Sequence, residues 1–107
     1  MYYSDIMKNV EMNIEKMQEA YAKKLKICGH PLRLKILSVI KEETPCVREL
    51  WEYLEEVQPV ISQHLAILKD SGIVSSEVDG NKRMYYITDP FVDEMISLVK
   101  AYAFSKK

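Results

Sequence analysis

The chain has 107 residues, of which 48% are apolar, and a formal net charge of −1. This length predicts a single domain over residues 1–107 with one hydrophobic core, and the two cysteines exclude a disulfide-stabilised framework. The sequence has no apolar run of membrane-spanning length and begins without the apolar segment of a signal peptide, so we expect a cytoplasmic protein with no membrane partner.

The first predicted helix covers residues 4–26 and carries an apolar seam. The apolar residues recur in alternating steps of three and four, as in a coiled coil. They are Met7, Val10, Ile14, Met17 and Tyr21. One domain would struggle to cover this seam alone, so the pattern predicts a dimer interface; packing of the seam on the chain's own core is the alternative.

Two shorter helices are predicted next. The first begins at His30 and Pro31, because proline suits the first turn of a helix, and its Arg33 is expected to stay in solvent. The second covers residues 47–57, with Cys46 at the position of an N-cap. A thiol at a helix start can have a lowered pKa, so Cys46 is a candidate thiol sensor; a small filler residue is the alternative.

The helix predicted over residues 58–71 has one apolar and one polar face. Pro59 fits its first turn and Gly72 ends it. Its apolar stripe must face a core and consists of Ile61, Leu65 and Leu68. Ser62, Gln63 and the edge residue His64 are left outside, and glutamine can bind adenine through two hydrogen bonds. With the preceding helix this makes a helix-turn-helix whose second member reads DNA; an ordinary amphipathic core helix is the alternative.

A β-hairpin follows, with strands at residues 73–78 and 84–88 and a glycine turn between them. Its tip at residues 79–83 would be the wing of a winged helix-turn-helix. The acidic residues gather at 49–56 and 89–94, whereas Lys69, Lys82 and Arg83 fall on the reading helix and the wing, where we expect them to bind DNA. The negative total charge therefore does not exclude a DNA-binding face.

Asp89 and Pro90 predict the start of a last helix. Its apolar residues cover too much of its circumference for one chain, so Met95, Leu98 and Tyr102 are expected at the dimer interface. The predicted fold is mainly α with a small β-hairpin, in the order ααααββα. Residues 1–28 and 89–107 would form the dimerisation helices, and residues 30–88 the winged-helix core.

Four stretches of the chain, CGHPLRLKIL, PCVREL, QPVISQHLAILKDSGIV and DGNKRMYYI, together resemble the ArsR/SmtB family of winged-helix repressors over about residues 20–104. The resemblance implies a homodimer that binds an inverted-repeat operator in double-stranded DNA and leaves it when an inducer, often a metal ion, binds. At matching positions it implies that the DNA-facing residues are Gln58, Val60, Ser62, Gln63 and His64, with Lys82 and Arg83 on the wing. Val57 stands where the family usually has a capping serine.

The family's metal ligands do not match this chain. Members that sense soft metals have Cys-Val-Cys where this chain has Cys46, Val47 and Arg48. The last helix offers carboxylates but no histidine, and carboxylates alone are poor zinc ligands. We therefore expect no metal site and no cofactor, and the inducer is unknown.

An enzyme is not expected, because no third residue orients a Cys46 and His64 pair and no glycine loop would hold a phosphate. The alternative to a DNA-binding repressor is a winged-helix protein–protein interaction module with no sequence-specific DNA readout.

Overall fold

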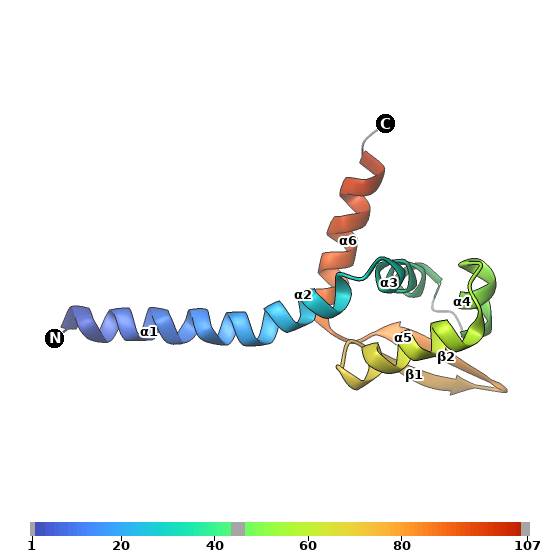
Figure 1. The fold of residues 1–107 in the computed structure, drawn as a ribbon, viewed down its shortest axis with the longest axis horizontal. Helices are drawn as coiled ribbons and strands as arrows, with labels where there is room; N and C mark the ends of the chain where they lie inside the picture. Colours follow the sequence, from blue (N-terminus) through green and yellow to red (C-terminus); the bar gives the residue numbers. More distant parts are fainter. Residues whose placement is uncertain (1, 44–46, 106–107) are drawn as a thin grey trace.

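The computed structural model describes the backbone of residues 2–43 and 47–105, and the side chains of most of them (Figure 1). The N-terminal helix runs without a break through α1 (Tyr2–Met17), a π-helical turn η1 (Gln18–Ala22) and α2 (Lys23–Cys28). It is followed by α3 (Pro31–Glu43), α4 (Val47–Tyr53), α5 (Gln58–Asp70), β1 (Val74–Asp79), β2 (Lys82–Ile87) and α6 (Pro90–Ser105). With the N-terminal helix counted once, this is the predicted order ααααββα.

The hydrophobic core joins α3, α4, α5, the base of the hairpin and the first half of α6. Its buried side chains are Cys28, Ile36, Leu37, Ile40, Leu50, Ile61, Leu65, Leu68, Ile73, Val74, Val92 and Ile96. Trp51 and Leu54 pack against this cluster while remaining partly exposed. The predicted winged helix-turn-helix fold is confirmed.

The hairpin has a two-residue turn. β1 pairs antiparallel with β2 from Val74 opposite Ile87 to Asp79 opposite Lys82, so both strands reach further toward the tip than predicted. Gly80 has a φ of 65°. Glycine with positive φ at the first central position is typical of a type II′ turn, which matches the twist of the strands.

The second predicted helix ends earlier than expected. α4 stops at Tyr53, whereas the sequence predicted a helix to residue 57. The Glu56 amide donates a hydrogen bond to the Trp51 carbonyl oxygen (3.0 Å), which closes a turn over residues that would otherwise extend the helix. This turn lets α5 leave in a new direction.

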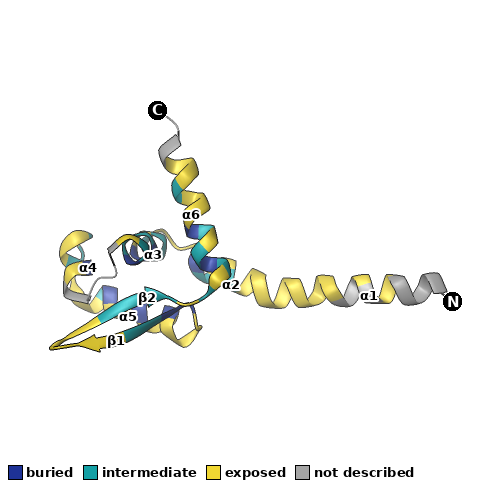
Figure 2. Ribbon diagram, turned by 180° about the vertical axis from the view of Figure 1, so that it is seen from behind, coloured by how far each residue is buried: buried dark blue, intermediate teal, exposed yellow. Residues whose placement is uncertain are grey.

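Two helices project from the winged-helix body. α1 extends far to one side and α6 leaves at a steep angle to it (Figure 1). The radius of gyration is 17.4 Å, compared with about 13 Å for a compact chain of 100 residues. Figure 2 shows that the described parts of α1 are exposed throughout. None of the helices, over the residues that the structure describes, is long and apolar enough to cross a membrane.

Charged side chains join the projecting helices to the body. Lys24 of α2 forms an ion pair with Asp89, with 2.7 Å between Nζ and Oδ2. The Oδ1 atom of Asp89 also accepts a hydrogen bond from the Val92 amide (3.1 Å), which caps α6 as predicted. On α3, Lys41 pairs with Asp93, and Glu42 pairs with Lys100.

Candidate nucleic-acid interface

α5 presents a polar surface because its apolar stripe is fully used by the core. Ile61, Leu65 and Leu68 are buried. Gln58, Ser62 and Gln63 are exposed, as predicted, and no core side chain covers them. Val60, also predicted to face DNA, is half-buried. The exposed glutamines and serine offer both donors and acceptors to a base edge.

The ends of α5 are defined by backbone hydrogen bonds. Pro59 lies in the first turn, and Val57 at the N-cap makes no side-chain hydrogen bond to the helix. At the other end Gly72 has a φ of 74°. The Gly72 amide donates to the Lys69 carbonyl oxygen and the Ile73 amide to that of Leu68, each at 3.0 Å, which is a Schellman motif. The chain thus turns from α5 into β1 with its backbone groups satisfied.

Glu55 in the turn before α5 has a left-handed backbone with a φ of 55°, and it is the only non-glycine residue with positive φ in the described chain. This conformation costs an L-residue about 1–2 kcal/mol. The turn of a helix-turn-helix often contains glycine. Glu55 therefore stores backbone strain next to the start of α5.

Two cations meet where α5 adjoins the wing. Lys69 Nζ lies 3.4 Å from Ser76 Oγ, and Arg83 Nη1 lies 3.2 Å from the same oxygen. Both cations were predicted as DNA-binding residues, but their common partner Ser76 was not. Lys82 lies at the tip opposite Asp79. All three cations are exposed.

His64 lies on the flank of α5 that faces α3. Its Nδ1 atom accepts a hydrogen bond from Arg33 Nε (3.0 Å), and its ring centroid lies 4.6 Å from that of His30. Arg33 Nη1 also donates to the Ile27 carbonyl oxygen (3.1 Å). Burial lowers the pKa of His64 below 6.5, and the charges of His30 and Arg33 lower it further. Contact between His64 and DNA remains a prediction.

The prediction that Arg33 stays in solvent is wrong. The side chain is half-buried because its guanidinium group reaches both the end of α2 and the flank of α5. His30 and Arg33 lie one helical turn apart at the start of α3, so the sequence could have indicated that these two side chains are neighbours. The approach of His64, which lies 31 residues after Arg33, could not be deduced from that spacing.

The predicted dimer residues fall into two groups. Met7, Val10, Ile14, Met17, Tyr21, Leu98 and Tyr102 are exposed large apolar residues. Met95 instead packs against the chain's own core. Whether these residues meet a second chain remains a prediction.

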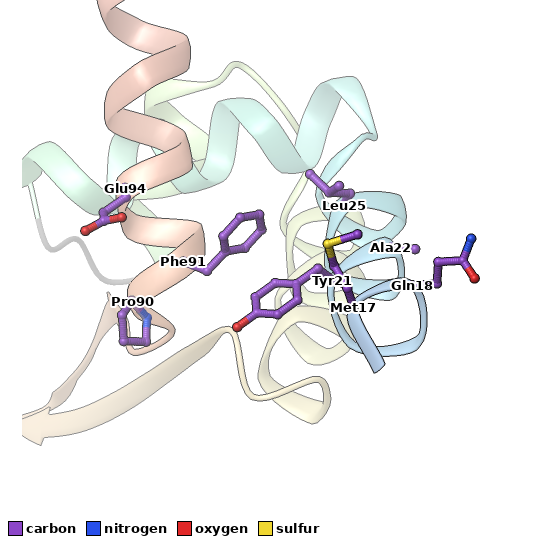
Figure 3. A pocket seen from close by; sticks show the side chains of 8 residues that line it. All are labelled: Met17, Gln18, Tyr21, Ala22, Leu25, Pro90, Phe91 and Glu94. Atoms are coloured by element: carbon purple, nitrogen blue, oxygen red, sulfur yellow. The ribbon is translucent and has the colours of Figure 1, made fainter. Parts of the chain in front are cut away.

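An apolar groove of about 720 Å³ lies between the N-terminal helix and the start of α6. Figure 3 shows Met17, Tyr21 and Leu25 on one side and Phe91 on the other. The rings of Tyr21 and Phe91 meet edge to face, with 4.9 Å between their centroids. The exposed seam therefore continues into this groove instead of ending at the body.

The cysteines and histidines of the described residues do not fit a metal ion. Cys46 lies outside these residues, and Cys28 is buried, which raises the pKa of its thiol. In the part of the chain that the structure describes, no three His, Cys, Asp or Glu side chains gather as ligands. The two histidines that do meet lie beside the Arg33 guanidinium, a cation that disfavours a second cation.

Comparison with known proteins places this site in a family. The family model for bacterial regulatory proteins of the arsR family matches residues 30–76. An uncharacterized HTH-type transcriptional regulator of Methanocaldococcus jannaschii is 42% identical over 87 residues, which cover 80% of this chain and 97% of that protein. The HTH-type transcriptional repressor SmtB of Mycobacterium tuberculosis is 33% identical over 79% of this chain, which spans 63% of that repressor.

A solved structure shows the same fold. Reduced HlyU from Vibrio cholerae superposes with a TM-score of 0.80 at 29% identity, covering 86% of this chain and 96% of that one.

Proposed function

The chain belongs to the ArsR family of bacterial regulatory proteins, and from that premise we propose that it is a homodimeric transcriptional repressor that binds an inverted-repeat operator. The observation that carries this proposal is the exposed Gln58, Ser62 and Gln63 surface of α5, flanked by the cations of the wing. α5 would lie in the major groove, and the hairpin would lie beside it along the backbone.

The polar residues of α5 and the cations at the wing would have different roles in DNA binding. Gln63 and Ser62 lie in the first half of α5, the part of a recognition helix that contacts base edges, and would read sequence. Lys69, Lys82 and Arg83 would contact phosphates, which fix register but carry no sequence information. Ser76 supports this division, because it holds Lys69 and Arg83 together at one point of the reader and wing.

The dimer would form through the exposed apolar seam. Residues of α1, η1 and α6 that face solvent in one chain would be covered by the same residues of a second chain, which gives the self-complementary interface of a two-fold dimer. The groove between Tyr21 and Phe91 would lie within that interface. A two-fold dimer would present two reading helices to two half-sites.

Selection from a random-sequence duplex library tests this function. The full-length protein should enrich duplexes with an inverted repeat whose half-sites lie about 34–36 Å apart, or a multiple of that distance. The affinity should also fall steeply with salt, because phosphate contacts release counterions.

Enrichment of no sequence, together with a flat salt dependence, would favour the alternative of a protein-binding module. The Gln, Ser and Gln surface of α5 favours DNA over that alternative.

A further inference from the structure

Arg33 connects three elements that must keep their places for DNA to be read. It stands on α3, donates one hydrogen bond to the Ile27 carbonyl oxygen near the end of α2 (3.1 Å) and another to His64 Nδ1 on α5 (3.0 Å). Ile27 belongs to the same continuous helix as the exposed apolar seam. The guanidinium group is therefore a direct bridge between the N-terminal helix and the flank of the reading helix.

We propose that Arg33 positions the reading helix through His64, and that sequence-specific DNA binding therefore depends on the protonation state of His64. The proposal rests on the DNA-binding function proposed above. Arg33 acts through His64 and needs no contact with DNA.

The hydrogen bond requires a neutral imidazole. Arg33 Nε carries a proton and donates it, so His64 Nδ1 must offer its lone pair and the ring proton must sit on Nε2. A proton from solvent that adds to Nδ1 removes that lone pair. Arginine cannot give up its own proton in compensation. Two donors with positive charge would then face each other, and the bridge would open.

Burial, His30 and Arg33 all disfavour protonation of the His64 ring. The ring of His30 lies 4.6 Å away, before α3, and Arg33 approaches from α3 itself. The charge of Glu56, in the turn before α5, favours the protonated ring, but it is outweighed: the pKa of His64 is lowered, first by burial and then by His30 and Arg33. The bridge is thus intact at neutral pH and opens as the pH falls through the lowered pKa of His64.

Opening the bridge would affect reading more than overall attraction to DNA. His64 directly follows Gln63, so a rotation of α5 on this flank turns the exposed glutamine away from its base. Lys69 and Arg83 do not depend on this bridge, because they converge on Ser76 of β1 and not on Arg33 or His64. Sequence discrimination should fall while general DNA attraction is kept.

The experiment measures the affinity ratio between a duplex selected by the full-length protein at pH 7.5 and a random duplex, from pH 7.5 to about pH 5.5, the range in which histidine titrates. The wild-type ratio should fall by about tenfold or more, the scale of one hydrogen bond to a charged group. His64→Asn places an amide oxygen that can accept from Arg33 and cannot titrate, so its ratio should stay constant.

His30→Asn is the matched control. His30 Nδ1 accepts a hydrogen bond from the Leu32 amide (3.1 Å) at the start of α3, and asparagine can cap a helix in the same way. This variant removes the other imidazole of the pair while it leaves the bridge in place. It should still lose specificity at low pH. Arg33→Met should show the reduced ratio at every pH.

A direct contact between His64 and a DNA phosphate predicts the opposite dependence of DNA affinity on pH. A protonated His64 on phosphate would make both duplexes bind more tightly as the pH falls, and that result would overturn the proposal. A wild-type ratio that does not change with pH would also overturn it, while leaving the DNA-binding function standing. Failure to select any duplex at pH 7.5 would overturn both.

The hydrogen bond between Arg33 and His64 can also be tested in the free protein, without DNA. Nitrogen-15 NMR of the free protein should show His64 as the Nε2–H tautomer at pH 7.5 and a pKa that rises in Arg33→Met. A His64 ring that titrates identically in the wild type and in Arg33→Met would contradict the bridge, even if Arg33→Met binds DNA poorly because it folds poorly.

Discussion

Asp89 Oδ2 lies 2.7 Å from Lys24 Nζ, so the residue that caps α6 also holds the N-terminal helix. The same carboxylate accepts the Val92 amide through its other oxygen. One side chain therefore fixes the relative position of the two helices that carry the exposed apolar residues.

Asp89→Ala should lower the free energy of unfolding by about 1 kcal/mol or more, the value of a lost N-cap. Asp89→Asn is the matched variant: it keeps an oxygen for the Val92 amide and loses the charge that Lys24 contacts, so it should be less destabilised. Urea unfolding of the three proteins measures this. An equal loss in both variants would show that the cap contributes nothing.

The ion pair of Asp89 with Lys24 predicts that the stability of the fold depends on pH. Burial alone would raise the pKa of Asp89, but the Lys24 ammonium and the Val92 amide outweigh it, and the pKa is lowered below 3.8. The stabilisation is present above that value and is lost as the pH falls below it. The difference between wild type and Asp89→Ala should therefore shrink in acid.

Leu98→Glu should convert a dimer into monomers. Leu98 is 59% exposed on α6, beside other exposed apolar residues, and a buried unpaired carboxylate in an interface is strongly unfavourable. Ser97→Glu adds the same charge at the neighbouring position and should remain dimeric. Sedimentation at micromolar concentration distinguishes them, and a monomeric wild type would refute the interface.

Gln63→Ala should remove discrimination at one base pair in each half-site. The carboxamide can pair with the N6 and N7 edge of adenine, and its loss should cost about 1–3 kcal/mol on the selected duplex. Binding to random DNA should change little. Competition with duplexes substituted at each position locates the effect; a uniform loss over all sequences would assign Gln63 to the backbone.

Arg83→Ala should weaken selected and random duplexes alike. A phosphate contact contributes about one unit to the slope of log affinity against log salt, so the slope should fall by about two per dimer if both wings bind. Arg83→Lys keeps the charge and should keep most of the slope. Altered base preference in Arg83→Ala would mean that the wing enters a groove and reads it.

Glu55→Gly should stabilise the fold. Relief of a left-handed L-residue yields about 1–2 kcal/mol, while the greater freedom of glycine in the unfolded chain costs about 0.4–1 kcal/mol. The net gain in thermal or urea unfolding should lie between about 0 and 1.6 kcal/mol, centred on about 0.8 kcal/mol. Glu55→Gln removes the charge but keeps the strain, so an equal gain in that variant would point to charge repulsion instead.

The sequence predicted the elements whose signals are local. The period of Ile61, Leu65 and Leu68 identified α5 and its polar face, and the glycine turn before Lys82 identified the hairpin. The helix end that differs most from its prediction is that of α4 at Tyr53, two residues before Glu55, where the chain adopts a conformation that glutamate does not favour. No propensity could have indicated it, because the turn is imposed by packing of α4 and α5 on the core.

Contacts between distant residues could not be predicted in the same way. Lys69 and Arg83 were assigned to DNA separately, and only the fold brings both to Ser76. His30 and His64 were considered as isolated residues on different helices, yet their rings meet. Met95 shared the apolar pattern of Leu98, but α6 happens to turn it inward. These contacts depend on the tertiary structure, which the spacing of apolar residues along the sequence does not reveal.

The unbroken N-terminal helix acts as a lever. From Tyr2 to Cys28 it would measure about 40 Å at 1.5 Å per residue. Among the described residues, its contacts to the body lie near its base: the Lys24 ion pair, the Arg33 contact to Ile27 and the ring contact of Tyr21 with Phe91. A small change of angle at that base becomes a displacement of several ångströms at the far end. In a dimer built on this helix, the spacing of the two reading helices would be set by the angle at which each lever leaves its own body. Any signal that alters the base could thus move the half-site contacts without touching either reading helix.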